Sequence, residues 1–185
     1  MSEILFTTTR LLGRVFTNAD AEAFSAYRSD PDIAIYQGWD TPVSLAKAQE
    51  FIAEMRMLEM GMPGLWYQIA LERNHSPGLI GDVAFHILRR DDRQAEIGYT
   101  ISGSHQQQGY GSEGVSGLLG FLFQEFGLHR VTATCDTENT ASICLLQKLG
   151  FRQEGHFIEN YSIKGQWRSD YLFALLAREW ESRNL

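Results

Sequence analysis

The chain has 185 residues, of which 44% are hydrophobic and 21% charged, as is typical of one soluble globular domain. Its formal net charge of −7 argues against general nucleic-acid binding and favours a cationic partner such as an amine. No segment has the roughly 20 apolar residues that span a membrane, and the N-terminus lacks the pattern of a signal peptide. We therefore expect one cytoplasmic domain over residues 1–185, without a membrane partner.

The first part of the chain alternates short helical and irregular segments. Residues 10–16 are predicted as the first strand and residues 21–27 as a short helix. Pro31 lies in a segment that should break this helix. Residues 33–39 are predicted to be irregular and aromatic, and a second helix should begin at Ser44.

The middle and C-terminal parts contain most of the predicted strands. The predicted strands are residues 66–71, 79–88, 94–101, 130–135, 151–163 and 166–176. The predicted helices are residues 112–126 and 140–149, and residues 178–185 form a tail. Hairpins come first, and strand–helix–strand–helix–hairpin follows. This order predicts a mixed α/β (α+β) sheet with one parallel crossover.

The two cysteines, Cys135 and Cys144, lack the spacing of a zinc site and are too few for a disulfide framework. Both lie in apolar runs, so we expect two buried thiols in a reducing compartment. We predict no metal site.

A loop with two glycines, residues 106–112, joins a predicted strand to the longest predicted helix. Glycines at the start of a helix leave backbone N–H groups unpaired, and the helix dipole adds positive charge there. The loop therefore predicts a site for a pyrophosphate, with an ordinary strand-to-helix turn as the alternative.

Residues 109–114 also match the dinucleotide-binding pattern GxGxxG, and Asp136 follows near a strand end. The preceding strand ends too far upstream for a tight turn, however, and only one strand–helix–strand unit is predicted. A dinucleotide-binding oxidoreductase is therefore the less favoured alternative. The loop is not a phosphate-binding P-loop, because no Gly-Lys-Ser/Thr follows it.

The pattern Gln-x-x-Gly-x-Gly at residues 106–111 resembles motif A of the GNAT superfamily of N-acetyltransferases. Asn-x-x-Ser at residues 139–142 and Lys-Leu-Gly-Phe at residues 148–151 resemble the next segment of that family. Residues 9–12 and 154–155 resemble the RimJ/RimL-like branch, which acetylates the N-termini of ribosomal proteins.

This resemblance implies a mostly antiparallel, splayed sheet of about six to seven strands, flanked by about four helices. It implies direct transfer of an acetyl group from acetyl-CoA to a primary amine, either a protein N-terminus or a small amine. The protein would be a monomer or a homodimer. A domain that binds CoA without catalysis is the alternative function.

The resemblance also implies which residues hold acetyl-CoA. They are Tyr99, Ile101, Gln106, Gln107, Gln108, Gly109, Tyr110, Gly111, Ser112 and Asn139. Ser142 would be the acid that protonates the departing thiolate. The alternative roles are a helix N-cap for Asn139 and a small packing residue for Ser142.

Glu96 lies on the polar face of its predicted strand and is our candidate for the base that takes a proton from the amine. A salt bridge to an arginine is the alternative role. Glu159 is a rival base, and many relatives need none. His86 is expected to be a core histidine.

Tyr36, Gln37 and Trp39 are predicted to line the acceptor pocket, with packing beneath a loop as the alternative. Acceptor choice should depend on residues 33–44 and 162–169, where the resemblance is weakest.

Overall fold

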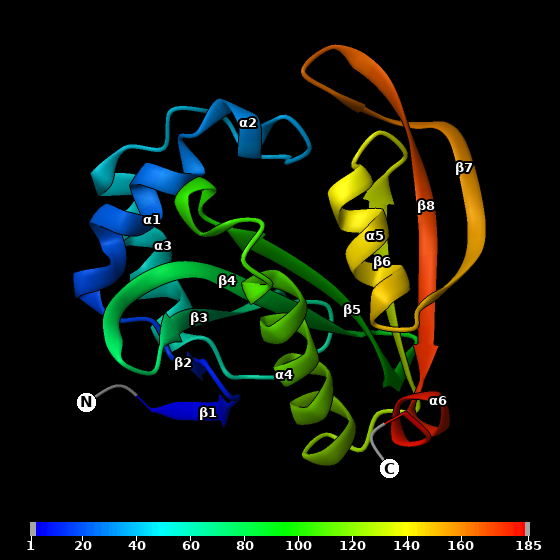
Figure 1. Ribbon diagram of the computed structural model, residues 1–185. Coiled ribbons are helices and arrows are strands. Elements are labelled where there is room, and N and C mark those ends of the chain that lie inside the picture. The colour runs from blue at the N-terminus through cyan, green and yellow to red at the C-terminus, as the bar shows by residue number, and fades with distance from the viewer. Residues whose placement is uncertain (1–2, 184–185) are drawn as a thin grey trace.

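The structure is a computed structural model that describes residues 3–183. Its elements are β1 (Ile4–Thr7), β2 (Leu11–Arg14), α1 (Ala21–Arg28), α2 (Pro31–Ala34), α3 (Leu45–Met57), β3 (Tyr67–Arg73), β4 (Ser76–Leu88), β5 (Asp91–Ile101), α4 (Tyr110–Gln124), β6 (Arg130–Asp136), α5 (Thr140–Lys148), β7 (Arg152–Ile163), β8 (Gln166–Leu176) and α6 (Ala177–Glu181). The strands form one sheet in the order β1-β2-β3-β4-β5-β6-β8-β7 (Figure 1). The predicted fold class is confirmed, with slightly more strands and helices than expected.

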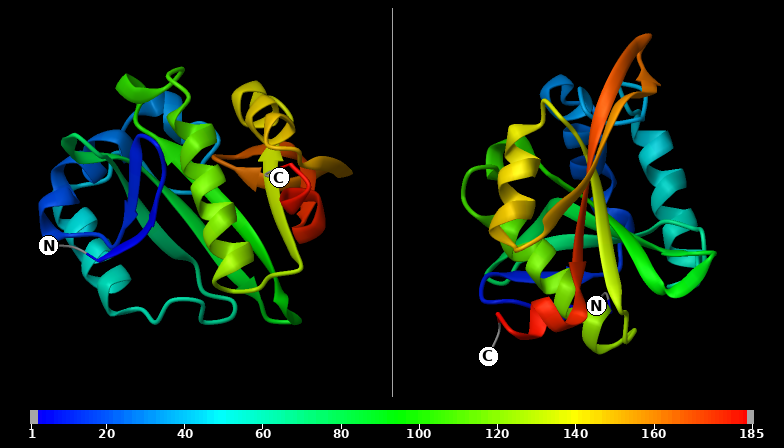
Figure 2. Two further views of the ribbon diagram at one scale, coloured as in Figure 1. Left: turned by 60° about the horizontal axis from the view of Figure 1, so that its bottom comes forward. Right: turned by 90° about the vertical axis from the view of Figure 1, so that its right-hand side faces the viewer.

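Helices cover both faces of the sheet (Figure 2). α4 and α5 pack on one face, where Leu118 of α4 belongs to the larger hydrophobic core. α1 and α3 pack on the other face, where Phe24 of α1 belongs to a second core. Along β3, Ile69 contributes to the first core and Ala70 to the second, as the alternation of a strand requires. None of the helices within residues 3–183 is long and apolar enough to cross a membrane.

The first strand of the sheet was not predicted. Residues 10–16 contain β2, as expected, but β1 precedes it and pairs with it in antiparallel fashion. Phe6 of β1 packs onto Gly117 of α4, where an added Cβ would lie only 2.6 Å from the ring. β1 therefore depends on a contact with a distant helix, which local patterns do not reveal.

Two short helices were also not predicted. The segment expected to break α1 begins α2, since Asp30 caps the new helix and Pro31 occupies its first turn. The predicted tail at residues 178–185 begins with α6, where Glu179 accepts a hydrogen bond from the backbone at the helix start. Residues 184–185 of that tail lie outside the described residues.

The sheet opens between β5 and β6, the strands that join its two parts. β5 and β6 run parallel and pair at three positions, of which the last joins Glu96 to Thr132. Within residues 3–183, the register of the two strands does not extend beyond this pair, so residues 97–101 and 133–136 diverge. β6 instead pairs along its whole length with β8. The result is the predicted splayed sheet, with an opening flanked by α4 and α5 (Figure 1).

Candidate active site

The loop before α4 presents a row of unbonded backbone N–H groups. Within residues 3–183, the amides of residues 107–112 donate no hydrogen bond, whereas Gln106 N–H donates to Gly103 O at 3.3 Å. Gly109, with φ +83°, is the N-cap of α4, and no side chain caps this helix. The first bond of the helix runs from Glu113 N–H to Gly109 O at 3.1 Å. Six free donors at the positive end of a helix make a site for an anion.

Arg10, from the turn before β2, holds this loop in place. Its Nε lies 2.6 Å from the Glu113 carboxylate, and its Nη1 donates to Gln108 O at 3.0 Å. The guanidinium also lies over the Tyr110 ring, 4.6 Å from the centroid. The Gln108 carbonyl and the Tyr110 ring are thus held by Arg10, and the Gln108 side chain donates to Ser104 O at 2.9 Å. These two residues do not line the adjacent cavity, unlike the other loop residues predicted for the site.

Two connected cavities lie in the opening of the sheet. The first, which we call the helix-end cavity, measures about 470 Å³ and lies between the start of α4 and α5. The second, the sheet cavity, measures about 430 Å³ and lies between β3–β5 and the β6–β8 side. The residues that line both are Tyr36, Gln37, Tyr99, Thr100, Asn139 and Ser142. Ile101, Gln106, Gln107, Gly109, Gly111 and Ser112 line the helix-end cavity alone.

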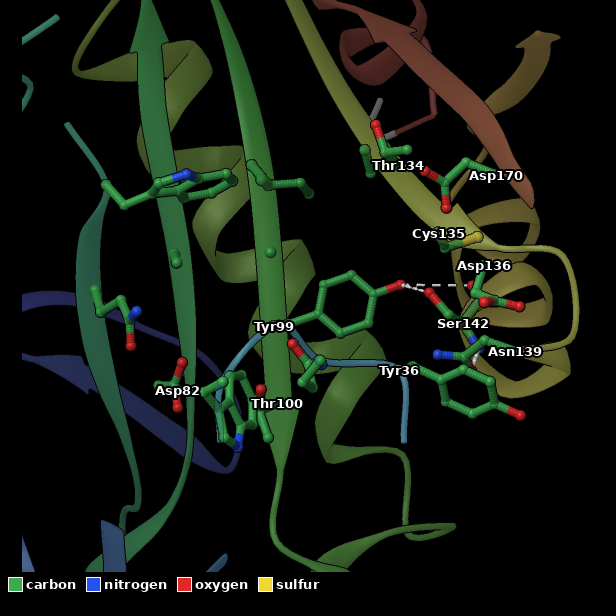
Figure 3. Close-up of a pocket in the computed structure, with 18 of the residues that line it drawn as sticks. Tyr36, Asp82, Tyr99, Thr100, Thr134, Cys135, Asp136, Asn139, Ser142 and Asp170 are labelled. Atoms are coloured by element: carbon green, nitrogen blue, oxygen red, sulfur yellow. Dashed lines mark hydrogen bonds between the residues drawn. The ribbon is translucent and has the colours of Figure 1, made fainter. Parts of the chain in front are cut away.

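A pair of hydroxyl groups spans the junction of the two cavities (Figure 3). Tyr99 OH from β5 and Ser142 Oγ from α5 are 2.7 Å apart, and either can be the donor. Burial raises the pKa of Tyr99, so its phenol carries its proton at neutral pH. Asn139 Oδ1 accepts a hydrogen bond from Ser142 N–H at 3.1 Å, so Asn139 is an N-cap, the alternative role considered above. Its amide N–H groups make no hydrogen bond to the described residues.

Two carboxylates of the sheet cavity are each held by an arginine and a tyrosine. Asp82 lies 3.0 Å from Arg28 and accepts a hydrogen bond from the Tyr27 hydroxyl. Asp136 lies 2.6 Å from Arg168 and accepts from Tyr161 OH at 2.8 Å. Burial alone would raise the pKa of Asp136, but hydrogen bonds, led by that from Arg168, hold it below its ordinary value.

The predicted base lies next to the sheet cavity rather than in its wall. Glu96 Oε1 accepts a hydrogen bond from Thr134 Oγ1 at 3.0 Å, and Oε2 is 3.8 Å from Nε2 of His86. The partners of Glu96 are thus a threonine and a histidine, and neither is the arginine of the salt bridge considered above. Thr134 does line the cavity. Glu159, the rival, is exposed in β7 and lines neither cavity.

His86 differs from the expected core histidine with satisfied hydrogen bonds. Its ring packs edge-on against Trp66 at 4.4 Å between centroids. Nδ1 is buried and has no hydrogen-bond partner within residues 3–183.

The three predicted acceptor residues do line the sheet cavity. Trp39 also packs on Arg28, with 3.8 Å from the guanidinium carbon to the ring centroid, and its Nε1 donates to the Arg28 carbonyl at 2.9 Å. Tyr36 OH donates to Glu138 O at 3.3 Å, which connects the loop after α2 to the segment before α5. These residues therefore combine both roles considered above: they line the sheet cavity, and Tyr36 and Trp39 also hold the loop to the rest of the fold.

The expectation of two buried thiols is wrong for one of them. Cys135 is buried, but Cys144 is exposed. Both lie in apolar runs, yet α5 buries only one face, on which Leu146 is fully buried. An apolar run on a helix does not bury each of its members.

Several residues of the sheet cavity were not predicted to belong to the site. They are Arg28, Asp82, Asp136, Tyr161 and Asp170. Of these, Asp136 had been considered only as part of the dinucleotide-binding pattern. One signal was present for Asp170, a charged residue directly before the apolar end of its predicted strand. The other four lie on α1, β4, β6 and β7, which come together only in the folded protein, so no local pattern could have linked them.

Comparison with known proteins identifies the family. Residues 10–152 match the family model of the acetyltransferase (GNAT) domain. An uncharacterized N-acetyltransferase of Bacillus subtilis, YoaA, is 36% identical over 151 residues, which are 82% of this chain and 84% of that protein. The ribosomal protein uS5-alanine N-acetyltransferase of Escherichia coli is 26% identical over 183 residues, which are 96% of this chain and 93% of that protein.

Among solved structures, RimJ of Mycobacterium smegmatis in complex with CoA-disulfide aligns with a TM-score of 0.79 and 25% identity. The alignment covers 91% of this chain and 83% of that protein. The chain therefore belongs to the GNAT family of acetyltransferases.

Proposed function

We propose that this acetyltransferase binds acetyl-CoA across its splayed strands and transfers the acetyl group directly to a primary amine. The observation that carries the proposal is the row of unbonded amides at residues 107–112. They border the helix-end cavity, which shares six lining residues with the sheet cavity between β5 and β6. The RimJ structure named above contains CoA, which supports CoA as the ligand of this family's cleft.

The residues present fit such a donor. The amides of residues 107–112 would bind the pyrophosphate, because free N–H groups at a helix start favour phosphate oxygens. The side-chain amide of Asn139 would bond the pantetheine arm, and the backbone near Tyr99 and Ile101 would hold it. Acetyl-CoA supplies the thioester, and the protein supplies position and proton transfer.

The Tyr99–Ser142 pair supports a role in protonating the leaving group. Ser142 was the predicted acid, but an isolated hydroxyl is a weak one. Its contact of 2.7 Å with a phenol that keeps its proton gives the pair a donor at the junction of the two cavities. We propose that Ser142 delivers the proton and that Tyr99 replenishes it.

We propose that the acceptor is a protein N-terminus or a small amine and that it binds in the sheet cavity. The E. coli relative is named as an alanine N-acetyltransferase of ribosomal protein uS5, and this protein substrate favours the first of these. The carboxylates of the cavity suit a cationic acceptor. Glu96 stays a prediction as base, and its route to the cavity runs through Thr134.

Release of free thiol from acetyl-CoA tests this function. We would compare a peptide with a free N-terminal alanine, the same peptide with an acetylated N-terminus and the polyamine spermidine. We expect thiol release with at least one free amine and none with the blocked peptide. Tight CoA binding without thiol release for any amine in a wider panel would instead indicate a CoA-binding domain without catalysis.

A further inference from the structure

Asp170 of β8 differs from the other two aspartates that line the sheet cavity. Asp82 and Asp136 each have an arginine and a tyrosine as partners. Asp170 has neither partner among residues 3–183, and the one hydrogen bond to its carboxylate comes from Asn160 Nδ2 at 3.3 Å. A carboxylate without a fixed cation in a cavity wall is free to bind a cation that enters the cavity.

The surroundings of Asp170 increase its tendency to take up a proton. The titratable groups that face it are Asp136 and Cys135 on β6, Glu96 on β5 and Tyr161 on β7. Burial first, and then the negative charges of Asp136 and Glu96, raise the pKa of Asp170 above the ordinary 3.8. The nearest positive charge on β8 is Arg168, two residues before Asp170, and its guanidinium is already bonded to Asp136 and Glu138.

Asp170 also lies close to the proposed acid. Its strand partner is Asp136, and Figure 3 shows its carboxylate beside Cys135, above Ser142. Cys135 interacts both with the charge of Asp170 and with the Ser142 hydroxyl, so it separates the two. A ligand in the sheet cavity can therefore reach the carboxylate at one end and the Tyr99–Ser142 pair at the other.

Given the proposed function, we infer that Asp170 binds the acceptor as a primary ammonium ion and accepts its proton. The substrate class is an amine that is protonated at neutral pH. Glu96 then acts through its negative charge, which keeps Asp170 basic, rather than by contact with the amine. This assigns the base to a residue that the sequence patterns did not single out.

The proton balance of the transfer is complete with these groups. Asp170 takes one proton from the ammonium ion and releases it to solvent, which leaves a neutral amine. The nitrogen lone pair forms a bond to the thioester carbonyl carbon, and the carbon–sulfur bond breaks. Sulfur receives a proton from the Ser142–Tyr99 pair. The nitrogen loses its second proton to solvent, from which the pair is reprotonated.

The variant Asp170→Asn tests the inference, with Glu96→Gln for comparison and Asp92→Asn as an exposed carboxylate control at the start of β5. We would measure kcat/KM against pH at saturating acetyl-CoA, with the alanine peptide and with spermidine. At pH 7.5, Asp170→Asn should lose at least tenfold. The loss should be larger for spermidine, because alkyl amines, with pKa values of about 10, are less often neutral than an α-amine with a pKa of about 8.

The size of the defect should also depend on pH in a way that a structural role would not produce. The wild type should lose activity as the pH falls through the raised pKa of Asp170, and the variant should lack this limb. The ratio of wild-type to variant activity should shrink as the pH rises toward the pKa of the amine. Glu96→Gln should move the acid limb to lower pH, and Asp92→Asn should change nothing.

Two measurements besides activity complete the test. The melting temperature of Asp170→Asn should equal or exceed that of the wild type, because an unpaired half-buried carboxylate costs stability. The carboxyl ¹³C resonance of Asp170 should titrate above 3.8 and shift when spermidine is added to the CoA complex.

The outcomes separate this inference from the proposed function. If the wild type acetylates no amine, both fall. If the wild type is active while Asp170→Asn keeps its rate and its acid limb, only the assignment of Asp170 falls. A large loss of melting temperature in Asp170→Asn together with a uniform loss of activity at all pH values would make Asp170 structural and would overturn the inference.

Discussion

At the scale of single residues, the site depends on hydroxyls and carboxylates whose partners are unequal. Tyr99 and Ser142 form a neutral pair, whereas Asp136 is tied to Arg168 and Asp170 is not. These differences give each group a distinct tendency to hold or release a proton. Two substitutions test the two kinds of environment separately.

Tyr99→Phe tests the hydroxyl pair. It keeps the ring but removes the hydroxyl that contacts Ser142 at 2.7 Å. We expect kcat to fall by at least tenfold, which is about 1.4 kcal/mol of barrier, while the Kd of acetyl-CoA changes by less than threefold. Ser142→Ala should reduce kcat similarly, and the double variant should be little worse than either. Unchanged kcat in Tyr99→Phe would remove the phenol from the mechanism.

Asp136→Asn tests the buried pair with Arg168. Loss of one partner of a buried ion pair should lower the free energy of unfolding by roughly 3 kcal/mol. The pKa of Asp136 is lowered in the folded protein, so its stabilisation is fully present well above 3.8 and is lost as the pH falls through the lowered value. In denaturant unfolding, the variant should therefore have a lower free energy of unfolding than the wild type at pH 7, and this difference should vanish in acid. Equal stability of the two proteins at pH 7 would contradict this role.

At the scale of elements, the anion site depends on how α4 begins. Gly109 adopts a left-handed conformation that an L-residue enters at a cost of about 1–2 kcal/mol. An added Cβ would also lie 3.2 Å from Arg10 Nη2. The loop geometry and its fixed amides thus depend on one residue at the N-cap of the helix.

Gly109→Ala should raise the Kd of CoA by about tenfold or more. Alanine disfavours the left-handed conformation of residue 109, so the backbone N–H groups of the loop would no longer point at the pyrophosphate. Gly127→Ala is a matched control at the opposite end of α4, with φ +60° and no atom within 4 Å of the added Cβ. Both variants should lose similar stability, but only the first should lose CoA affinity by calorimetric titration. Equal CoA affinity in the two variants would show that the loop conformation is not needed.

The elements also show what sequence patterns can and cannot predict. The strand ranges 79–88 and 166–176 and the helix start at Ser44 agree closely with the structure, since alternation and capping are local. The exact point at which β5 and β6 separate is not local. Glu96 is paired with Thr132 at the last position where the two strands are in register, so it lies just before the opening and not in the cavity wall.

At the scale of the whole molecule, the site exists because one sheet is built from two parts. β1 to β5 form one part and β6 to β8 the other, and three residue pairs join them. The sheet cavity takes Asp82 from the first part and Asp136 and Asp170 from the second. Such walls bring together residues far apart in the sequence, which explains why the family motifs predicted the helix-end cavity better than the acceptor side.

The binding of CoA by the free amides is the claim on which the account depends most directly. In ¹⁵N NMR spectra, titration with CoA should shift the amide resonances of residues 107–112 strongly and those of Gly127 and Gly165 little. NADH should produce no comparable shifts. Tight CoA binding that leaves the amides of residues 107–112 unchanged, or equal shifts with NADH, would contradict the account.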